Sequence, residues 1–84
     1  ARGSQGRRLA TEALAALIPE VFARRDMHRV FAEVDDRNVG AQRVLERLGL
    51  RCEARLVEAD WFKGEWATVR IYAILEREWW AGAA

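Results

Sequence analysis

The sequence predicts an α/β fold of the α+β type, in which helices and the strands of one small sheet follow each other. Apolar residues recur at helical spacing in the segments 7–24 and 39–48, and they alternate along the segments 28–35, 51–59 and 67–75. The chain has no repeat or linker, and its 84 residues allow at most one small domain. We therefore expect the order helix, strand, helix, strand, strand, with a mixed or antiparallel three-stranded sheet and two helices.

The first helix is expected from Arg7 to Arg24, where a broad apolar stripe runs along one side. Two neighbouring rows form this stripe: Leu9, Ala13, Leu17 and Val21, and beside them Ala10, Leu14, Ile18 and Phe22. Pro19 removes one helix hydrogen bond, so we expect a kink or a break near residues 15–18.

A strand from His28 to Asp35 is followed by a turn over residues 35–40 (DDRNVG) and by a second helix, Val39–Leu48. Asn38 is among the best residue types for capping the start of that helix. Gly49 stands where a helix end favours a left-handed residue.

The remaining strands, Arg51–Ala59 and Ala67–Leu75, are expected to flank a hairpin tip at Lys63-Gly64. The tail after Leu75 is expected to be a strand end or a short turn. The aromatic residues Trp61, Phe62 and Trp66 either pack the hairpin onto the sheet or line a pocket.

Composition excludes several classes of partner. The 14 basic and 13 acidic residues leave a net charge of +1, which argues against a nucleic acid or an anionic membrane as partner. No apolar run approaches the roughly 20 residues of a membrane span, and no signal peptide is visible. The single cysteine, Cys52, fits a reducing compartment, and we expect it to be a buried or half-buried structural thiol. We expect a cytoplasmic protein. We expect no metal site at His28, because no second histidine or cysteine pair lies nearby.

The segment Ser4–Leu14 (SQGRRLATEAL) joins a basic, glycine-containing turn to the first helix. Backbone N–H groups at a helix start have no internal acceptor and bind anions such as phosphate. Gly6 permits close backbone approach, and Arg7 and Arg8 add cationic donors. An ordinary solvated first turn has the same features, so this segment alone leaves both interpretations open.

Three segments together carry a resemblance to a known family: QGRRLATEAL, HRVFAEVDDRNVGAQRVLERLGL and FKGEWATVRIYAIL. They resemble the C-terminal half of the GNAT-fold N-acetyltransferases, and they are most similar to the subgroup that acetylates the N-terminal amine of ribosomal proteins. The resemblance covers Gln5 to Trp79. It implies acetyl-CoA as co-substrate and a primary amine, on a protein N-terminus or a small molecule, as acceptor. It also implies that residues 1–84 are a partial domain, the CoA-binding half of the fold, inactive on its own.

The resemblance also implies the residues of the cofactor site. The family's pyrophosphate loop, Q/R-x-x-G-x-G/A, becomes Gln-x-x-Arg-x-Ala here, so that Arg8 replaces the central glycine. Asn38 matches the asparagine that contacts the pantetheine arm of CoA. The implied cofactor-binding residues are Gln5, Gly6, Arg7, Arg8, Leu9, Ala10, Thr11, Asn38, Ala41 and Arg43.

The catalytic acid and base are not identified by the sequence. Leu45 and Ala41 stand where members of the family place a tyrosine or a serine hydroxyl, and the region that would supply a general base is absent. Two alternatives therefore stay open. Beside the N-acetyltransferase, these are a non-catalytic CoA-binding module and a small α/β module that forms a homodimer through an open sheet edge.

Overall fold

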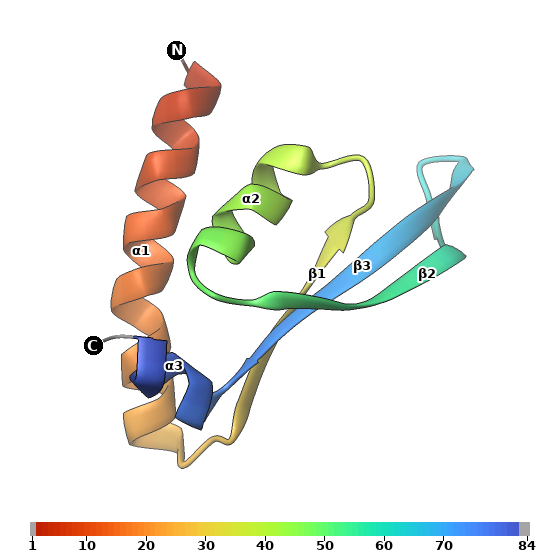
Figure 1. Ribbon diagram of the computed structural model, residues 1–84. Coiled ribbons are helices and arrows are strands. Elements are labelled where there is room, and N and C mark those ends of the chain that lie inside the picture. The colour runs from red at the N-terminus through yellow and green to blue at the C-terminus, as the bar shows by residue number, and fades with distance from the viewer. Residues whose placement is uncertain (1, 83–84) are drawn as a thin grey trace.

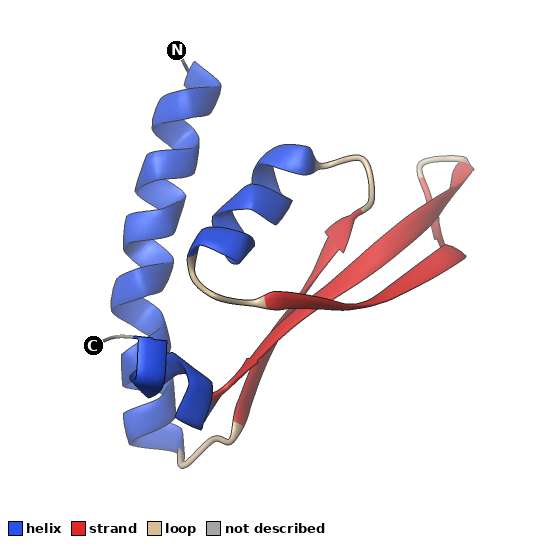
Figure 2. Cartoon of the chain, in the orientation of Figure 1, coloured by secondary structure: helices blue, strands red, loops and turns tan. Residues whose placement is uncertain are grey.

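The computed structural model describes residues 2–82, with the side chains of residues 2–11 and 25 outside that description. The elements follow in the order α1 (Arg2–Arg25), β1 (Arg29–Asp35), α2 (Val39–Arg47), β2 (Arg51–Phe62), β3 (Glu65–Leu75) and α3 (Glu76–Gly82) (Figures 1 and 2). The predicted fold class and the predicted order of the first five elements are confirmed, and a third helix is added.

The strands form one antiparallel sheet in the spatial order β1-β3-β2, so β3 is the central strand. Tyr72 in β3 lies opposite Ala32 in β1 and Cys52 in β2. Residues opposite each other on paired strands point to the same face of a sheet. The register therefore assigns alternate residues of β3 to the two faces of the sheet, of which only one is covered by helices.

The core lies on the face that α1 and α2 cover (Figure 1). Its buried members are Ile18, Phe22, Leu45, Leu50, Tyr72 and Ile74. Of the two apolar rows expected along α1, the row with Ile18 and Phe22 meets this core, whereas Leu17 in the other row is 51% exposed. No described helix covers the opposite face of the sheet, which carries Phe31, Glu33 and Asp35 of β1.

Helix α1 differs from the prediction at its start and at its proline. It begins at Arg2 instead of Arg7, and it continues through Pro19 without a break. A glycine costs a helix only about 1 kcal/mol, so Gly3 and Gly6 do not stop it. On either side of Pro19 the helix is held by Ile18 and Phe22, which are 4% and 2% exposed in the core.

Helix α2 has the predicted ends. Asn38 precedes it as the N-cap, and Gly49 after its C-terminus adopts the left-handed conformation, with φ of +94°. The N–H groups of Gly49 and Leu50 donate to the carbonyl oxygens of Glu46 and Leu45, both at 3.0 Å. This closes the helix and leads directly into β2.

The β2–β3 hairpin is longer than predicted, because its turn consists only of Lys63 and Gly64. Both residues have positive φ, 52° and 80°, which suits a two-residue hairpin turn. The expectation of a buried or half-buried Cys52 is wrong, since this thiol is exposed. Its side chain points to the helix-covered face, but β2 is an outer strand of the sheet.

The tail was expected to be a strand end or a short turn, and that prediction is wrong. It forms helix α3, whose first turn carries the acidic residues Glu76 and Glu78. The Glu78 carboxylate accepts the backbone N–H of Leu75 at 2.8 Å, and the N–H of Glu76 donates to the carbonyl of His28 at 2.9 Å. Acidic residues stabilise a helix start through the helix dipole. Trp79 packs against the core from this helix.

Candidate functional site

The connection between β1 and α2 is held by a dense set of hydrogen bonds. The backbone N–H of Asn38 donates to the carbonyl of Asp35 at 2.9 Å. Gln42, only 7% exposed, donates its side-chain Nε2 to the carbonyls of Asp35 and Asp36 at 3.2 and 2.9 Å. The start of α2 is therefore fixed in position against the end of β1.

Asn38 caps α2 with its side chain, as predicted. Its Oδ1 accepts the backbone N–H of Ala41 at 3.1 Å. Among the described residues, no acceptor is hydrogen-bonded to its amide N–H₂ group, and the side chain is exposed. One atom of this side chain serves the helix, while its two amide hydrogens are available to a ligand.

The other predicted residues of α2 occupy different environments. Ala41 is half-buried in the first turn, and Arg43 is exposed. Leu45 is 6% exposed and belongs to the core cluster. The Leu45 side chain therefore points into the apolar core, and neither Leu45 nor Ala41 carries a group that transfers a proton.

The seven predicted pyrophosphate-binding residues, Gln5, Gly6, Arg7, Arg8, Leu9, Ala10 and Thr11, lie on the helical backbone of α1, and their side chains are outside the described residues. In a helix only the first four N–H groups lack an internal acceptor. Because α1 begins at Arg2, only Gln5 of the seven falls within that set. The expected turn ahead of the helix is thus replaced by helix, and the phosphate contacts of this segment stay a prediction.

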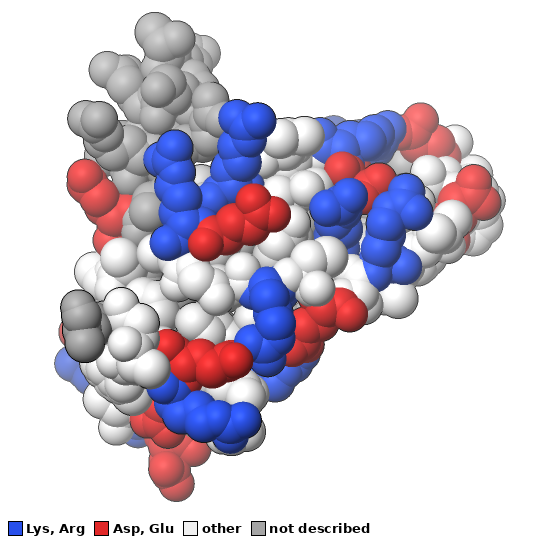
Figure 3. All heavy atoms as spheres, viewed as in Figure 1, with Lys and Arg blue, Asp and Glu red and all other residues white. Residues whose placement is uncertain are grey.

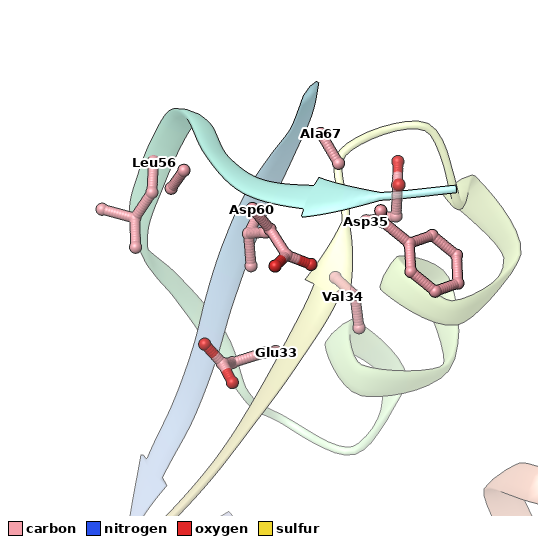
Figure 4. A pocket seen from close by; sticks show the side chains of 9 residues that line it. Glu33, Val34, Asp35, Leu56, Asp60 and Ala67 are labelled. Carbon is pink, nitrogen blue, oxygen red and sulfur yellow. The ribbon is translucent and has the colours of Figure 1, made fainter. Parts of the chain in front are cut away.

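A hollow of about 440 Å³ lies on the face of the sheet that the helices leave uncovered (Figure 4). Its lining includes three carboxylates, Glu33 and Asp35 from β1 and Asp60 from β2, over an apolar surface. The residues contributing that surface are Val34, Leu56, Ala59, Phe62, Ala67 and Val69. Arg37 donates hydrogen bonds to Asp35 and holds the pKa of that carboxyl below its usual value. Glu33 and Asp60 have no ion-pair partner among the described residues, so they leave negative charge in the hollow.

The three hairpin aromatics do not share one role, and the two tryptophans take neither of the expected roles. Phe62 lines the hollow, and the Lys63 ammonium lies 5.2 Å from the centroid of its ring. Trp61 and Trp66 pair edge to face at 5.0 Å between centroids, and both are more than half exposed. The two tryptophans therefore brace the hairpin against itself instead of packing it onto the sheet.

Basic and acidic side chains lie next to one another over the face seen in Figure 3. Within residues 2–82, no three potential metal ligands come together. None of the helices described here has both the length and the apolar character that crossing a bilayer requires.

Comparison with known proteins identifies the family. The model of the acetyltransferase (GNAT) domain matches residues 1–51, which is more than half of the chain. This chain belongs to the GNAT acetyltransferase family. It is 32% identical over 75 residues to the uncharacterized N-acetyltransferase YnaD of Bacillus subtilis, covering 89% of this chain and 44% of YnaD. It is 31% identical over 74 residues to the probable N-acetyltransferase YjcK of the same organism, covering 88% of this chain and 41% of YjcK. The chain thus spans less than half the length of these GNAT relatives.

Solved structures show the same fold. A mutant form of the spermidine/spermine N-acetyltransferase SpeG from Vibrio cholerae superposes with a TM-score of 0.87 at 22% identity, over 95% of this chain and 48% of SpeG. A GNAT-family acetyltransferase from Bacillus anthracis superposes with a TM-score of 0.78 at 33% identity, over 82% of this chain and 42% of that protein. These matches confirm the GNAT-like fold, whereas membership of the ribosomal-protein subgroup is not shown by them.

The hollow was not predicted from the sequence. Glu33 and Asp35 lie two apart on one face of a predicted strand, a position typical of strand-edge charges. Asp60, the third carboxylate of the hollow, follows a shift in the register of β2 between Leu56 and Asp60. Glu58, inside that irregular stretch, has φ of 48°, and its N–H donates to Thr68 Oγ1 at 3.1 Å. No local pattern of residue types marked this bulge in advance.

Proposed function

We propose that this chain is the CoA-binding half of an acetyl-CoA-dependent N-acetyltransferase that acetylates a primary amine. The observation that carries the proposal is the start of α2. There Asn38 uses its Oδ1 to cap the helix, and its amide N–H₂ group would donate to the pantetheine arm. Ala41 and Arg43, in the first turns of the same helix, would flank the cofactor.

The pyrophosphate contacts are proposed for residues 5–11. For the backbone N–H groups of this segment to reach phosphate oxygens, the first turns of α1 have to unwind when acetyl-CoA binds, because α1 begins at Arg2. Each glycine in these turns lowers helix stability by about 1 kcal/mol relative to alanine, which makes such unwinding inexpensive. Arg7 and Arg8 would then add charge to the phosphate site.

The proposed reaction is direct transfer. The amine nitrogen attacks the thioester carbonyl carbon, the carbon–sulfur bond breaks, and the amine loses one proton while the leaving thiolate gains one. Aligning the amine with the thioester supplies a large part of the rate acceleration in such reactions. This chain places no hydroxyl at Leu45 or Ala41, so its own contribution is binding and alignment.

The acceptor is proposed to enter over the open face of the sheet. The uncompensated carboxylates of Glu33 and Asp60 attract an ammonium group, and the apolar floor of the hollow suits an alkyl chain. The name of SpeG, a spermidine/spermine N-acetyltransferase, agrees with a small cationic amine as acceptor. The resemblance noted in the sequence favours a protein N-terminus, which is also a cationic amine at neutral pH.

Calorimetric titration of the full-length protein with acetyl-CoA tests the cofactor site, and an acetylation assay with spermidine and N-terminal peptides tests the reaction. We expect binding of acetyl-CoA and a mass gain of one acetyl group on at least one amine. Binding without transfer would instead support the non-catalytic CoA-binding module, which the side chains of Leu45 and Ala41 favour. No binding, together with a dimer in sedimentation, would support an interaction module that pairs through the outer edge of β1.

The hollow is tested by the double variant Glu33→Gln/Asp60→Asn. Removing both charges is expected to raise KM for a cationic amine by roughly threefold or more and to leave the KM for acetyl-CoA unchanged. Glu58→Gln removes an acidic side chain of the same strand that does not line the hollow, so it serves as the matched control. An unchanged amine KM in the double variant would place the acceptor elsewhere.

A further inference from the structure

Asp36 lies between two arginines at the point where β1 ends. Its Oδ1 accepts Nε of Arg55 at 3.1 Å and Nε of Arg70, and its Oδ2 accepts Nη2 of Arg55 at 3.1 Å. Arg55 and Arg70 are direct register partners on β2 and β3. Like charges directly opposite on paired strands repel each other, so this carboxylate joins two strands that would otherwise be driven apart at that position.

The backbone of Asp36 is hydrogen-bonded to β3 and to α2. Its N–H donates to the carbonyl of Thr68 in β3 at 2.9 Å. Its carbonyl accepts Nε2 of the buried Gln42 in α2 at 2.9 Å. Asn38 follows only two residues later, with its cap on the N–H of Ala41. Asp36 therefore connects Arg55 and Arg70 of the sheet to the loop that carries Asn38.

We propose that Asp36, clamped by Arg55 and Arg70, is a positioning residue that sets where Asn38 and the first turn of α2 meet acetyl-CoA. The inference rests on the proposed cofactor role of that turn. Asp36 itself is not proposed to contact the cofactor. It fixes the loop, and the loop presents the amide of Asn38.

A second carboxylate in the chain has similar surroundings but a different location. Glu53 in β2 accepts hydrogen bonds from Arg29 of β1 and from Arg51, at 2.5 and 3.2 Å. Its side chain is 29% exposed, against 20% for Asp36. It is not bonded to α2 or to the loop before it among the described residues. Glu53→Gln is therefore a matched control that breaks a comparable ion cluster at a distance from the cofactor turn.

The test compares Asp36→Asn with Glu53→Gln in the full-length protein. We expect Asp36→Asn to raise the Kd and the KM for acetyl-CoA by roughly three- to tenfold, in keeping with the loss of one charged hydrogen-bonded contact. The KM for the amine acceptor should change less than about twofold. Glu53→Gln should leave both constants unchanged, even if it lowers stability as much as Asp36→Asn does.

If Asp36→Asn does not fold, Arg55→Gln tests the positioning role instead. The Arg55 side chain is half-exposed, and its replacement leaves Arg70 paired with Asp36. Arg55→Gln should raise the Kd for acetyl-CoA by a smaller factor, again without affecting the amine KM. Equal rises in the KM for acetyl-CoA and the KM for the amine would overturn the positioning role. Equal effects of Asp36→Asn and Glu53→Gln would also overturn it. An unchanged Kd for acetyl-CoA in folded Asp36→Asn and Arg55→Gln would do the same. A parent protein that fails to bind acetyl-CoA at all would instead overturn the proposed function itself.

Discussion

Two substitutions of Asn38 separate the two tasks assigned to its side chain. Oδ1 accepts the N–H of Ala41 at 3.1 Å, whereas the amide N–H₂ is proposed to donate to the pantetheine arm. Asn38→Asp keeps an oxygen for the cap and removes the amide donor. Asn38→Ala removes both groups.

The expected magnitudes follow from these two contacts. Loss of an N-cap side chain costs about 1 kcal/mol of stability, so Asn38→Ala should lower the free energy of unfolding by about that amount. Aspartate caps a helix as well as asparagine does, and its charge suits the helix dipole, so Asn38→Asp should stay within about 0.5 kcal/mol of the parent. Loss of one donor to the cofactor, about 1 kcal/mol, should weaken acetyl-CoA binding about fivefold in both variants.

The assays are urea unfolding for stability and calorimetric titration with acetyl-CoA for affinity. We expect Asn38→Asp to lose affinity for acetyl-CoA while it keeps its stability, and Asn38→Ala to lose both. If Asn38→Asp binds acetyl-CoA as tightly as the parent, Asn38 acts only as a helix cap, and the main support for the cofactor site is lost.

Three further predictions concern stability. Phe22→Ala should lower the free energy of unfolding by about 3–5 kcal/mol in urea titration, since its ring is 2% exposed, while Leu17→Ala, at a 51% exposed position of the same helix, should change it by less than about 0.5 kcal/mol. Gly49→Ala should cost about 1–2 kcal/mol by the same measurement, because φ is +94°, and its new Cβ would also lie 3.4 Å from Cδ1 of Ile74; a smaller loss would mean that the turn relaxes. The hydrogen bonds from Arg55 and Arg70 lower the pKa of Asp36 to about 2, so this carboxylate stabilises the fold above its ordinary pKa of 3.8 and loses that effect as the pH falls toward about 2. Urea midpoints should therefore fall over this acid range, and Asp36→Asn should make the fall shallower; an identical pH profile would show that the clamp contributes nothing to stability.

Local patterns were sufficient to predict most of the fold. Helix α2 was predicted almost to the residue because its two ends depend on single residues, an asparagine cap and a left-handed glycine. The hairpin turn at Lys63-Gly64 is local in the same way. Helix α3 was missed because its start depends on a carboxylate, Glu78, that bonds the backbone of Leu75, although acidic residues in a potential first turn were a usable signal.

The candidate site depends more strongly on contacts between distant segments. Asn38 was predicted correctly as a cap from its residue type and position. The clamp of Asp36 by Arg55 and Arg70 joins residues up to 34 positions apart, and nothing in the local pattern paired them. The exposure of Cys52 also escaped prediction, because the alternation of a strand shows which residues share a face but not how far the helices extend over it.

Acetyl-CoA is proposed to bind across the start of α2 and the N-terminal segment of α1. Hydrogen–deuterium exchange of the full-length protein, with and without acetyl-CoA, tests this most directly. We expect slower exchange at residues 38–43 and altered exchange at residues 5–11, with little change in the β2–β3 hairpin. Protection confined to other parts of the chain, or none at saturating acetyl-CoA, would contradict it.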